Sequence, residues 1–185
     1  MHLGVPFSEH GIDVLGEVHK AGVKSVWDYL SDAGRSVWVC GSMNSSYVSP
    51  INGWVLPDPW TTELDPYPAG AMDDYFRFVS ANVQEHTRAE SPLTRDEQVR
   101  FLKFMARHGL SPKTVTAVVG QLARERRGNV HWQRAALLDR FQFDLFRWYF
   151  KKHRPDFSTF FLNSTAHYQH RYWRNMEPEH FKIKP

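Results

Sequence analysis

The sequence predicts an α/β fold, and three observations lead to that class. A short amphipathic helix is followed by the apolar run VWVC, residues 37–40, and a second apolar run, residues 157–162, follows a long helical stretch. Runs that are apolar on both faces are typical of parallel strands covered by helices on both sides. The chain has 185 residues, of which 42% are hydrophobic, so it is long enough to bury a core. We expect one partial α/β domain over residues 1–185, with part of a sheet, flanking helices, and a large helical insertion or cap over residues 73–153.

Residues after position 24 predict the first helix–strand step. Ser25, with Asp28 three residues later, forms a capping-box pattern at the start of a short helix. Gly34 is placed to end that helix in a left-handed conformation. The strand VWVC follows and contains Cys40, the only cysteine, which we expect to be a buried thiol. A single cysteine excludes an internal disulfide and a cysteine-rich zinc site.

Residues 45–70 predict a long loop. Prolines recur through this segment and exclude a long helix or an interior strand. They are Pro50, Pro57, Pro59, Pro66 and Pro68. Long loops that carry aromatic residues are commonly functional. Two interpretations remain open: the loop takes part in function, or it is a lid that only covers the edge of the sheet.

Four helices are predicted between residues 73 and 153. The second begins after Thr94, which forms a capping box with Glu97, and the third begins after Ser111, where Pro112 suits a first turn. The fourth carries an apolar stripe for packing and a basic side, which we interpret as a solvated face, with phosphate binding as the alternative. The stripe is Leu138, Phe141, Leu145, Trp148 and Tyr149, and the basic side is Arg134, Arg140, Arg147 and Lys151.

Polar residues follow both predicted strands. Ser42 and Asn44 come after the first strand, and Asn163, Ser164 and Thr165 come after the second. In open α/β sheets, ligands gather at the carboxyl ends of the strands. We therefore expect Ser42 and Asn44 to contact a substrate. The backbone amides of a helix that begins after the second strand would favour an anion there.

A pair of histidines, His167 and His170, lies in the segment that follows the second strand. Imidazoles three residues apart on a helix share a face, so both can reach one divalent ion. A zinc site needs three or four ligands, and the remaining ligands would have to come from elsewhere. The alternative is that His167 packs in the core while His170 hydrogen-bonds a loop carbonyl.

Charge and motif content exclude several function classes. The net charge of +3 and a pI near 9.0 permit anion binding, but no basic tract indicates a protein that binds a nucleic-acid duplex. No apolar stretch approaches the roughly 20 residues that span a bilayer. The N-terminus lacks the pattern of a signal peptide, so a cytoplasmic location is the default expectation. No G-x-S-x-G, glycine-rich phosphate loop or H-E-x-x-H motif is present, so the catalytic nucleophile is unknown.

Three segments together resemble the type I phosphodiesterase/nucleotide pyrophosphatase branch of the alkaline phosphatase superfamily. They are SVWDYLSDAGRSVWVCGSMNSSY, NGWVLPDPWTT and FSTFFLNSTAHYQHRYW. The first is similar to the helix–glycine–strand step that follows the family's catalytic loop. The last is similar to the family's strand that ends in a ligand-bearing turn, with a histidine followed closely by an aromatic pair. The resemblance covers most of the chain.

The resemblance implies hydrolysis of phosphate or sulfate esters by two metal ions and a threonine or serine nucleophile. The family's pair of metal ligands, an aspartate and a histidine four residues later, fits this sequence in two registers. Asn163 with His167 keeps the spacing but has a neutral amide in place of the carboxylate. Ala166 with His170 keeps the histidine and the aromatic pair after it but has no ligand at the aspartate position. Either change weakens the hold on a divalent cation.

The resemblance therefore implies that this chain is an internal piece of a larger enzyme. The family's nucleophile and first acidic ligand would precede residue 1, and its closing ligands would follow residue 185. His170, His167 and Asn163 would bind a divalent metal, zinc or manganese, and the chain alone would hydrolyse little or nothing. Two alternatives remain open: a non-catalytic α/β binding module with structural histidines, and a degenerate family member that has lost its site.

Overall fold

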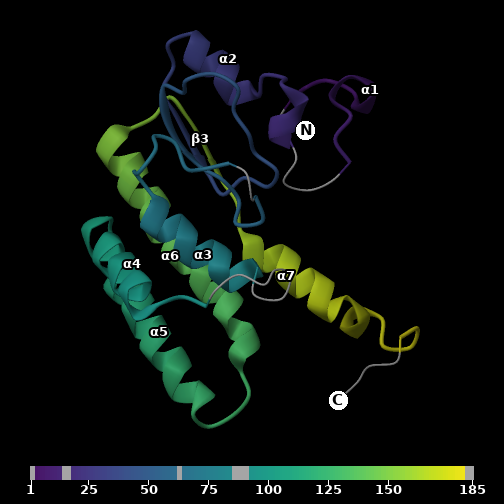
Figure 1. Cartoon of the computed structure of the whole chain (residues 1–185). Helices are drawn as coiled ribbons and strands as arrows, with labels where there is room; N and C mark the ends of the chain where they lie inside the picture. Colours follow the sequence, from purple (N-terminus) through teal and green to yellow (C-terminus); the bar gives the residue numbers. More distant parts are fainter. Residues whose placement is uncertain (1–2, 14–17, 62–63, 85–91, 182–185) are drawn as a thin grey trace. The chain divides into compact units, whose positions relative to one another are not determined.

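The structure, a computed structural model, describes residues 3–13, 18–61, 64–84 and 92–181. Within these residues the chain forms seven α-helices, three short 3₁₀ helices and three strands (Figure 1). The chain divides into two compact units. Unit 1 takes in Met1–Leu110 and Gln142–Phe161, and unit 2 takes in Ser111–Phe141 and Leu162–Pro185.

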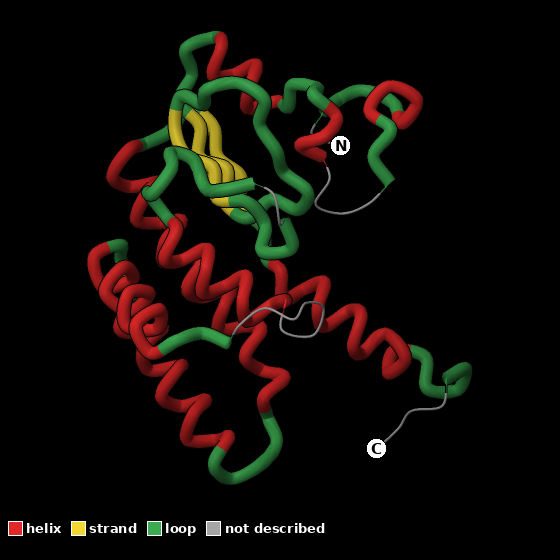
Figure 2. The backbone as a smooth tube through the Cα atoms, viewed as in Figure 1, coloured by secondary structure: helices red, strands yellow, loops and turns green. Residues whose placement is uncertain are grey.

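The sheet of unit 1 has three parallel strands in the order β2-β1-β3 (Figure 2). They are β1 (Val37–Cys40), β2 (Gly53–Leu56) and β3 (Phe157–Phe160). The helices and parallel strands confirm a mixed α/β fold. Strand β2 was not expected, because prolines surround it in the sequence. Its four residues lie between Pro50 and Pro57 at one lateral edge of the sheet. The prolines lie outside the paired segment, so they remove no hydrogen bond from the ladder.

Helices cover both faces of β1. On one face, Val37 and Val39 pack with Trp27 of α2 (Val26–Asp32) in a common core cluster. On the other face, Trp38 stacks on Phe146 of α6 (Arg134–His153), with ring centroids 6.3 Å apart, and donates its indole N–H to the Phe146 carbonyl at 3.2 Å. All four residues of β1 are 0% exposed. Cys40 is thus a buried thiol, as expected, and burial raises its pKa well above the usual value.

The buried carboxylate of Asp28 ties the loop after β1 to helix α2. Its Oδ2 closes the expected capping box with the N–H and hydroxyl of Ser25. Its Oδ1 accepts hydrogen bonds from the N–H of Val48 at 3.0 Å and from the N–H and hydroxyl of Ser49, both at 3.2 Å. Asp28 is fully buried, and this set of donors satisfies it.

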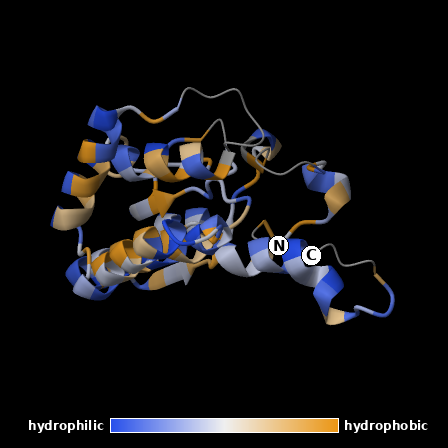
Figure 3. Ribbon diagram, turned by 90° about the horizontal axis from the view of Figure 1, so that it is seen from below, coloured by the Kyte–Doolittle hydropathy of each residue, from blue (hydrophilic) through white to orange (hydrophobic). Residues whose placement is uncertain are grey.

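Helices α3 (Asp73–Gln84) and α4 (Arg95–Arg107) pack against each other in unit 1 through stacked rings of Phe78 and Phe101, 3.8 Å apart. Hydrophilic and hydrophobic residues alternate around the helices in Figure 3, as amphipathic packing requires. The capping box of Thr94 and Glu97 is confirmed. Hydrogen bonds from the Thr94 N–H and from Arg77 lower the pKa of Glu97 to about 2.

Unit 2 contains α5 (Pro112–Glu125), the start of α6, and α7 (Asn163–Tyr172). Ser111 caps α5 as expected, since its hydroxyl accepts from the Thr114 N–H at 3.2 Å. Arg134 at the start of α6 pairs with Glu125, with N–O distances of 2.6 and 2.8 Å. The expected helical insertion over residues 73–153 is shared between the units: α3, α4 and the second half of α6 belong with the sheet.

The remaining short elements are α1 (Phe7–His10) and three 3₁₀ helices, Val18–Ala21, His131–Gln133 and Trp173–Met176. None of the helices in the described part of the chain combines the length and the apolar character needed to cross a membrane.

A cluster of aromatic rings in unit 1 contains two histidines. His153 lies 3.9 Å from the ring of Trp54, and His108 lies 4.5 Å from Trp148 and 5.9 Å from Tyr149 between ring centroids. Burial is the first cause that lowers the pKa of both histidines, and the charge of Lys152 lowers both further. The fold therefore favours their neutral forms.

Gly53 is required where β2 meets β1. Its φ is +145°, and a Cβ built on it would lie 2.0 Å from the Val37 carbonyl oxygen. Because that oxygen belongs to the backbone of the buried strand, it cannot move aside. We expect Gly53→Ala to lower the free energy of unfolding by on the order of 3 kcal/mol, measured by urea denaturation. Gly120→Ala is the control, because its Cβ meets nothing within 4 Å and alanine favours the helix interior. An equal loss in both variants would contradict this account.

The neutral histidine cluster predicts a pH dependence of stability. Because the folded pKa of His108 and His153 lies below the unfolded value of 6.5, the unfolded chain takes up protons first. Their contribution to stability is complete above pH 6.5 and is lost as pH falls through 6.5 toward the folded pKa. Urea midpoints should fall with acidification, and less so in the His108→Phe, His153→Phe double variant. The exposed His180→Ala variant should keep the wild-type slope, and an unchanged slope in the double variant would rule out the cluster as its source.

Candidate functional site

Because the three strands are parallel, their carboxyl ends lie together at one end of the sheet, which we call the sheet edge. The ladder continues one residue past β1 and past β3, since Gly41 donates to the Leu56 carbonyl at 2.9 Å and Phe161 donates to the Cys40 carbonyl at 3.3 Å. Ser42 and Asn44 therefore lie at the end of the central strand, which is where ligands gather in folds of this kind.

The turn after β1 lies directly under helix α6. Gly41 has φ +65°, and a Cβ on it would lie 2.5 Å from the side-chain nitrogen of Gln142. That nitrogen donates to the Phe161 carbonyl at 2.7 Å, so Gln142 closes over the ends of both β1 and β3. Sequence reasoning missed Gln142, because a glutamine between two phenylalanines on a helix gives no signal of such a contact.

Ser42 and Asn44 both take part in internal contacts. The Ser42 side chain is 5% exposed, and its hydroxyl pairs with that of Thr159 on β3 at 2.6 Å. Asn44 is half-buried, adopts φ +55°, and donates its N–H to Asp58 at 2.8 Å. The strand ends are thus joined to each other by the residues expected to contact a substrate.

Asp58 is a buried carboxylate beside this turn. It accepts from the backbone of Asn44, from the Trp60 N–H at 3.0 Å and from the Thr61 hydroxyl at 2.9 Å. The sequence shows Asp58 only as an aspartate in a proline-rich loop, with no sign of its burial. Its bonds fix the loop after β2 against the turn after β1.

Two buried hydroxyls in the same turn have unused hydrogen-bonding capacity. Ser45 is 2% exposed and Ser46 is 1% exposed, and neither side-chain oxygen has a hydrogen-bond partner among the described residues. Buried polar groups are normally satisfied by protein, water or ligand. Ser45 and Ser46 are thus exceptions to this rule within the turn, and their burial keeps them out of reach of a ligand.

In unit 2, the start of helix α7 is held by the carboxylate of Asp139 on α6. Asp139 accepts from the N–H of Asn163 at 3.1 Å, from the N–H of Ser164 at 3.1 and 3.3 Å, and from the Ser164 hydroxyl. Burial raises the pKa of Asp139, while the hydrogen bonds from Ser164 and Asn163 oppose that rise. The expected anion site at this helix start is wrong, because a side-chain carboxylate already binds these amides.

His167 and His170 lie on the exposed side of α7. Tyr168 and Tyr172 contact the ring of Trp132, with centroids 5.9 and 5.6 Å apart, and define the packed side of the helix. Both histidines are exposed, so the interpretation that places His167 in the core is wrong. By the helical period, Asn163 shares the face of the two histidines.

The metal ligands expected here form a pair of imidazoles and not a complete site. No group of three or more His, Cys, Asp or Glu side chains placed to hold an ion occurs within residues 3–13, 18–61, 64–84 and 92–181. His167 and His170 with the amide of Asn163 fit part of a coordination sphere, and further ligands are needed. The candidate residues also fall in two units, with Ser42 and Asn44 in unit 1 and Asn163, His167 and His170 in unit 2.

No protein-family model, curated protein or solved structure matches the chain. Its function is therefore inferred from the chemistry of its own residues.

The Asp139 contact predicts a measurable role in the stability of unit 2. Asp139→Asn removes the negative charge from the positive end of α7 and halves the accepting oxygens. We expect a loss of about 1–2 kcal/mol in unfolding free energy and reduced helical signal in circular dichroism. Asp96→Asn, an exposed aspartate in the first turn of α4, serves as the control and should cost less. Equal small effects of both substitutions would show that Asp139 does not hold the helix.

Proposed function

We propose that this chain is one part of a metal-dependent hydrolase of phosphate or sulfate esters, similar to phosphodiesterases and nucleotide pyrophosphatases. The observation that carries the proposal is the pair His167 and His170, exposed on one face of a helix that begins just after the last strand of a parallel sheet. Exposed imidazoles on one helix face are available to a metal, whereas buried or hydrogen-bonded imidazoles would not be.

Each residue has a defined role in this proposal. His167 and His170 supply two nitrogen ligands to a divalent ion, and Asn163 supplies an amide oxygen or orients a neighbouring ligand. Zinc suits imidazole ligands best, with manganese as the alternative. The bound ion would polarise the ester and activate a nucleophile. Asn44 and Ser42, which lie in unit 1 after β1, are the residues expected to contact the substrate.

The incomplete ligand set supports the proposal that this chain is one part of a larger hydrolase. Two imidazoles leave at least one coordination position for ligands from outside the described residues. The outer edge of β3 pairs with no other strand of the described chain, so the sheet has room for a further strand. We therefore expect the chain alone to turn over little or no substrate.

A specific observation favours a second candidate, a non-catalytic binding module or a degenerate family member. The position that would hold an acidic ligand is Asn163, and the nearby carboxylate of Asp139 is committed to backbone amides. In that case the chain would bind a ligand without hydrolysing it.

Zinc titration tests the ligand assignment. The full chain should bind one zinc ion with imidazole resonances of His167 and His170 shifting in NMR spectra. The His167→Ala, His170→Ala double variant should lose this binding, because it removes both imidazole ligands and the described residues contain no group of three or more ligands elsewhere. The exposed His180→Ala variant is the matched control and should bind zinc as the wild type does. Unchanged zinc binding in the double variant would remove both histidines from the proposal.

Hydrolysis of a p-nitrophenyl phosphodiester with added zinc or manganese separates the candidates. The chain alone should give little turnover, and the complete protein should lose metal-dependent turnover when both histidines are replaced. Robust turnover by the chain alone would contradict its role as a part. A complete protein that keeps its metal content and turnover without both histidines would contradict the ligand assignment.

A further inference from the structure

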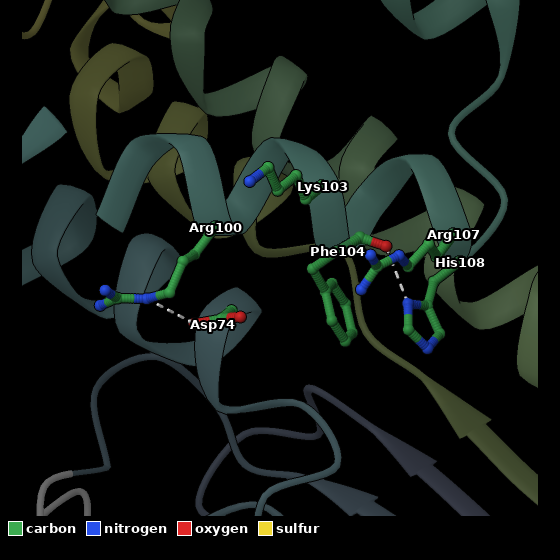
Figure 4. A pocket seen from close by; sticks show the side chains of 6 residues that line it. All are labelled: Asp74, Arg100, Lys103, Phe104, Arg107 and His108. Carbon is green, nitrogen blue, oxygen red and sulfur yellow. Dashed lines mark hydrogen bonds and ion pairs between the residues drawn. The ribbon is translucent and has the colours of Figure 1, made fainter. Parts of the chain in front are cut away.

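A cavity of about 360 Å³ opens on unit 1 between α3 and α4 (Figure 4). Its lining comes from one residue of α3, from one side of α4 and from the residue that caps the end of α4. The lining residues are Asp74, Arg100, Lys103, Phe104, Arg107 and His108. Cavities of this size fall at the lower end of the range that binds small molecules.

The rim of the cavity is cationic. Arg100, Lys103 and Arg107 are three and four residues apart along α4, so they share one face of the helix. Asp74 is the acidic residue of the lining and pairs with Arg100 at 3.1 Å. Three cations against one carboxylate leave two positive charges in excess.

Two of these cations are available to a ligand. The side chains of Lys103 and Arg107 make no hydrogen bond or ion pair with any other residue in the described ranges, and both are exposed. The guanidinium of Arg107 lies beside Phe104 and His108 in Figure 4. A guanidinium matches the oxygen geometry of a phosphoryl group, and an ammonium matches its charge.

The wall of the cavity is aromatic. The rings of Phe104 and His108 stack with centroids 4.0 Å apart and planes at 19°, and the His108 Nδ1 donates to the Phe104 carbonyl at 2.8 Å. His108 is half-buried, and burial lowers its pKa, which favours the neutral ring. An aromatic wall next to a cationic rim provides contact for an organic group as well as for its phosphate.

We infer that the cavity between α3 and α4 binds a small phosphate monoester, with Lys103 and Arg107 on the phosphate and the Phe104–His108 wall on the organic group. Binding at this cavity requires no hydrolysis and no metal. It is therefore independent of the proposed hydrolase activity.

Titration of the full chain with phenyl phosphate and with inorganic phosphate, followed in ¹H–¹⁵N correlation spectra, tests this inference. Both probes should cause saturable shifts in the backbone signals of residues 100–108. Phenyl phosphate should bind more tightly because its ring adds contact with the aromatic wall. If inorganic phosphate binds as tightly as phenyl phosphate, the site does not recognise an ester.

Three variants that change the charge of the cavity should alter phenyl phosphate binding, two by weakening it and one by strengthening it. Lys103→Gln and Arg107→Gln should each weaken phenyl phosphate binding by about three- to tenfold, because each removes a charged hydrogen-bond donor. Asp74→Asn should strengthen it, because Arg100 is released from its partner and the competing carboxylate is gone. Circular dichroism checks that each variant is folded, which the exposure of Lys103 and Arg107 favours.

Arg95→Gln is the matched control. Arg95 is an exposed arginine of the same helix and does not line the cavity, since its position falls on a different face of α4. It should leave binding unchanged. Equal weakening by Arg95→Gln and the cavity variants would show general attraction to a basic protein and overturn the inference. The absence of saturable shifts at millimolar phenyl phosphate would overturn it as well.

Discussion

The other elements of unit 1 depend on the complete burial of β1. The strand is hydrogen-bonded to β2 on one edge and to β3 on the other, and its side chains alternate between two covered faces. A strand with no exposed side needs a helix on each face, and α2 and α6 meet this need. The close approach of β2 in turn restricts position 53 to glycine. The two covering helices and the glycine at position 53 thus all follow from the four consecutive apolar residues of β1.

Buried carboxylates hold polar segments within each of the two units. Asp28, Asp58 and Asp139 each accept hydrogen bonds from at least three donors, most of them backbone N–H groups of loops or helix starts. A charge can be buried in this way because charged hydrogen bonds replace its lost hydration. The loops that leave the sheet edge are consequently fixed in place, which is the condition for a site that binds a ligand in a defined orientation.

The sequence predicted those features that depend on neighbouring residues. Both capping boxes, the proline at the start of α5 and the two apolar strands rest on spacings of a few residues, and all are present. Strand β2 escaped prediction because its partner is a buried strand and its own sequence is a short segment between prolines. Gln142 and Asp139 escaped because each contacts residues 19 to 25 positions later, a pairing that only the fold creates. The exposure of His167 likewise depends on Tyr168 packing against Trp132.

The commitment of these carboxylates bears on the choice of metal at the proposed site. A hard ion such as manganese is held chiefly by carboxylate oxygens, and Asp139, the aspartate beside α7, already accepts from Asn163 and Ser164. The ligands that remain on the exposed face of that helix are imidazoles and an amide. Imidazole nitrogens favour zinc, and a neutral ligand set leaves the full charge of the ion to be balanced by an anionic substrate or by an acidic ligand from elsewhere. On these grounds zinc is the better occupant of the two, and its affinity for the chain alone should be modest.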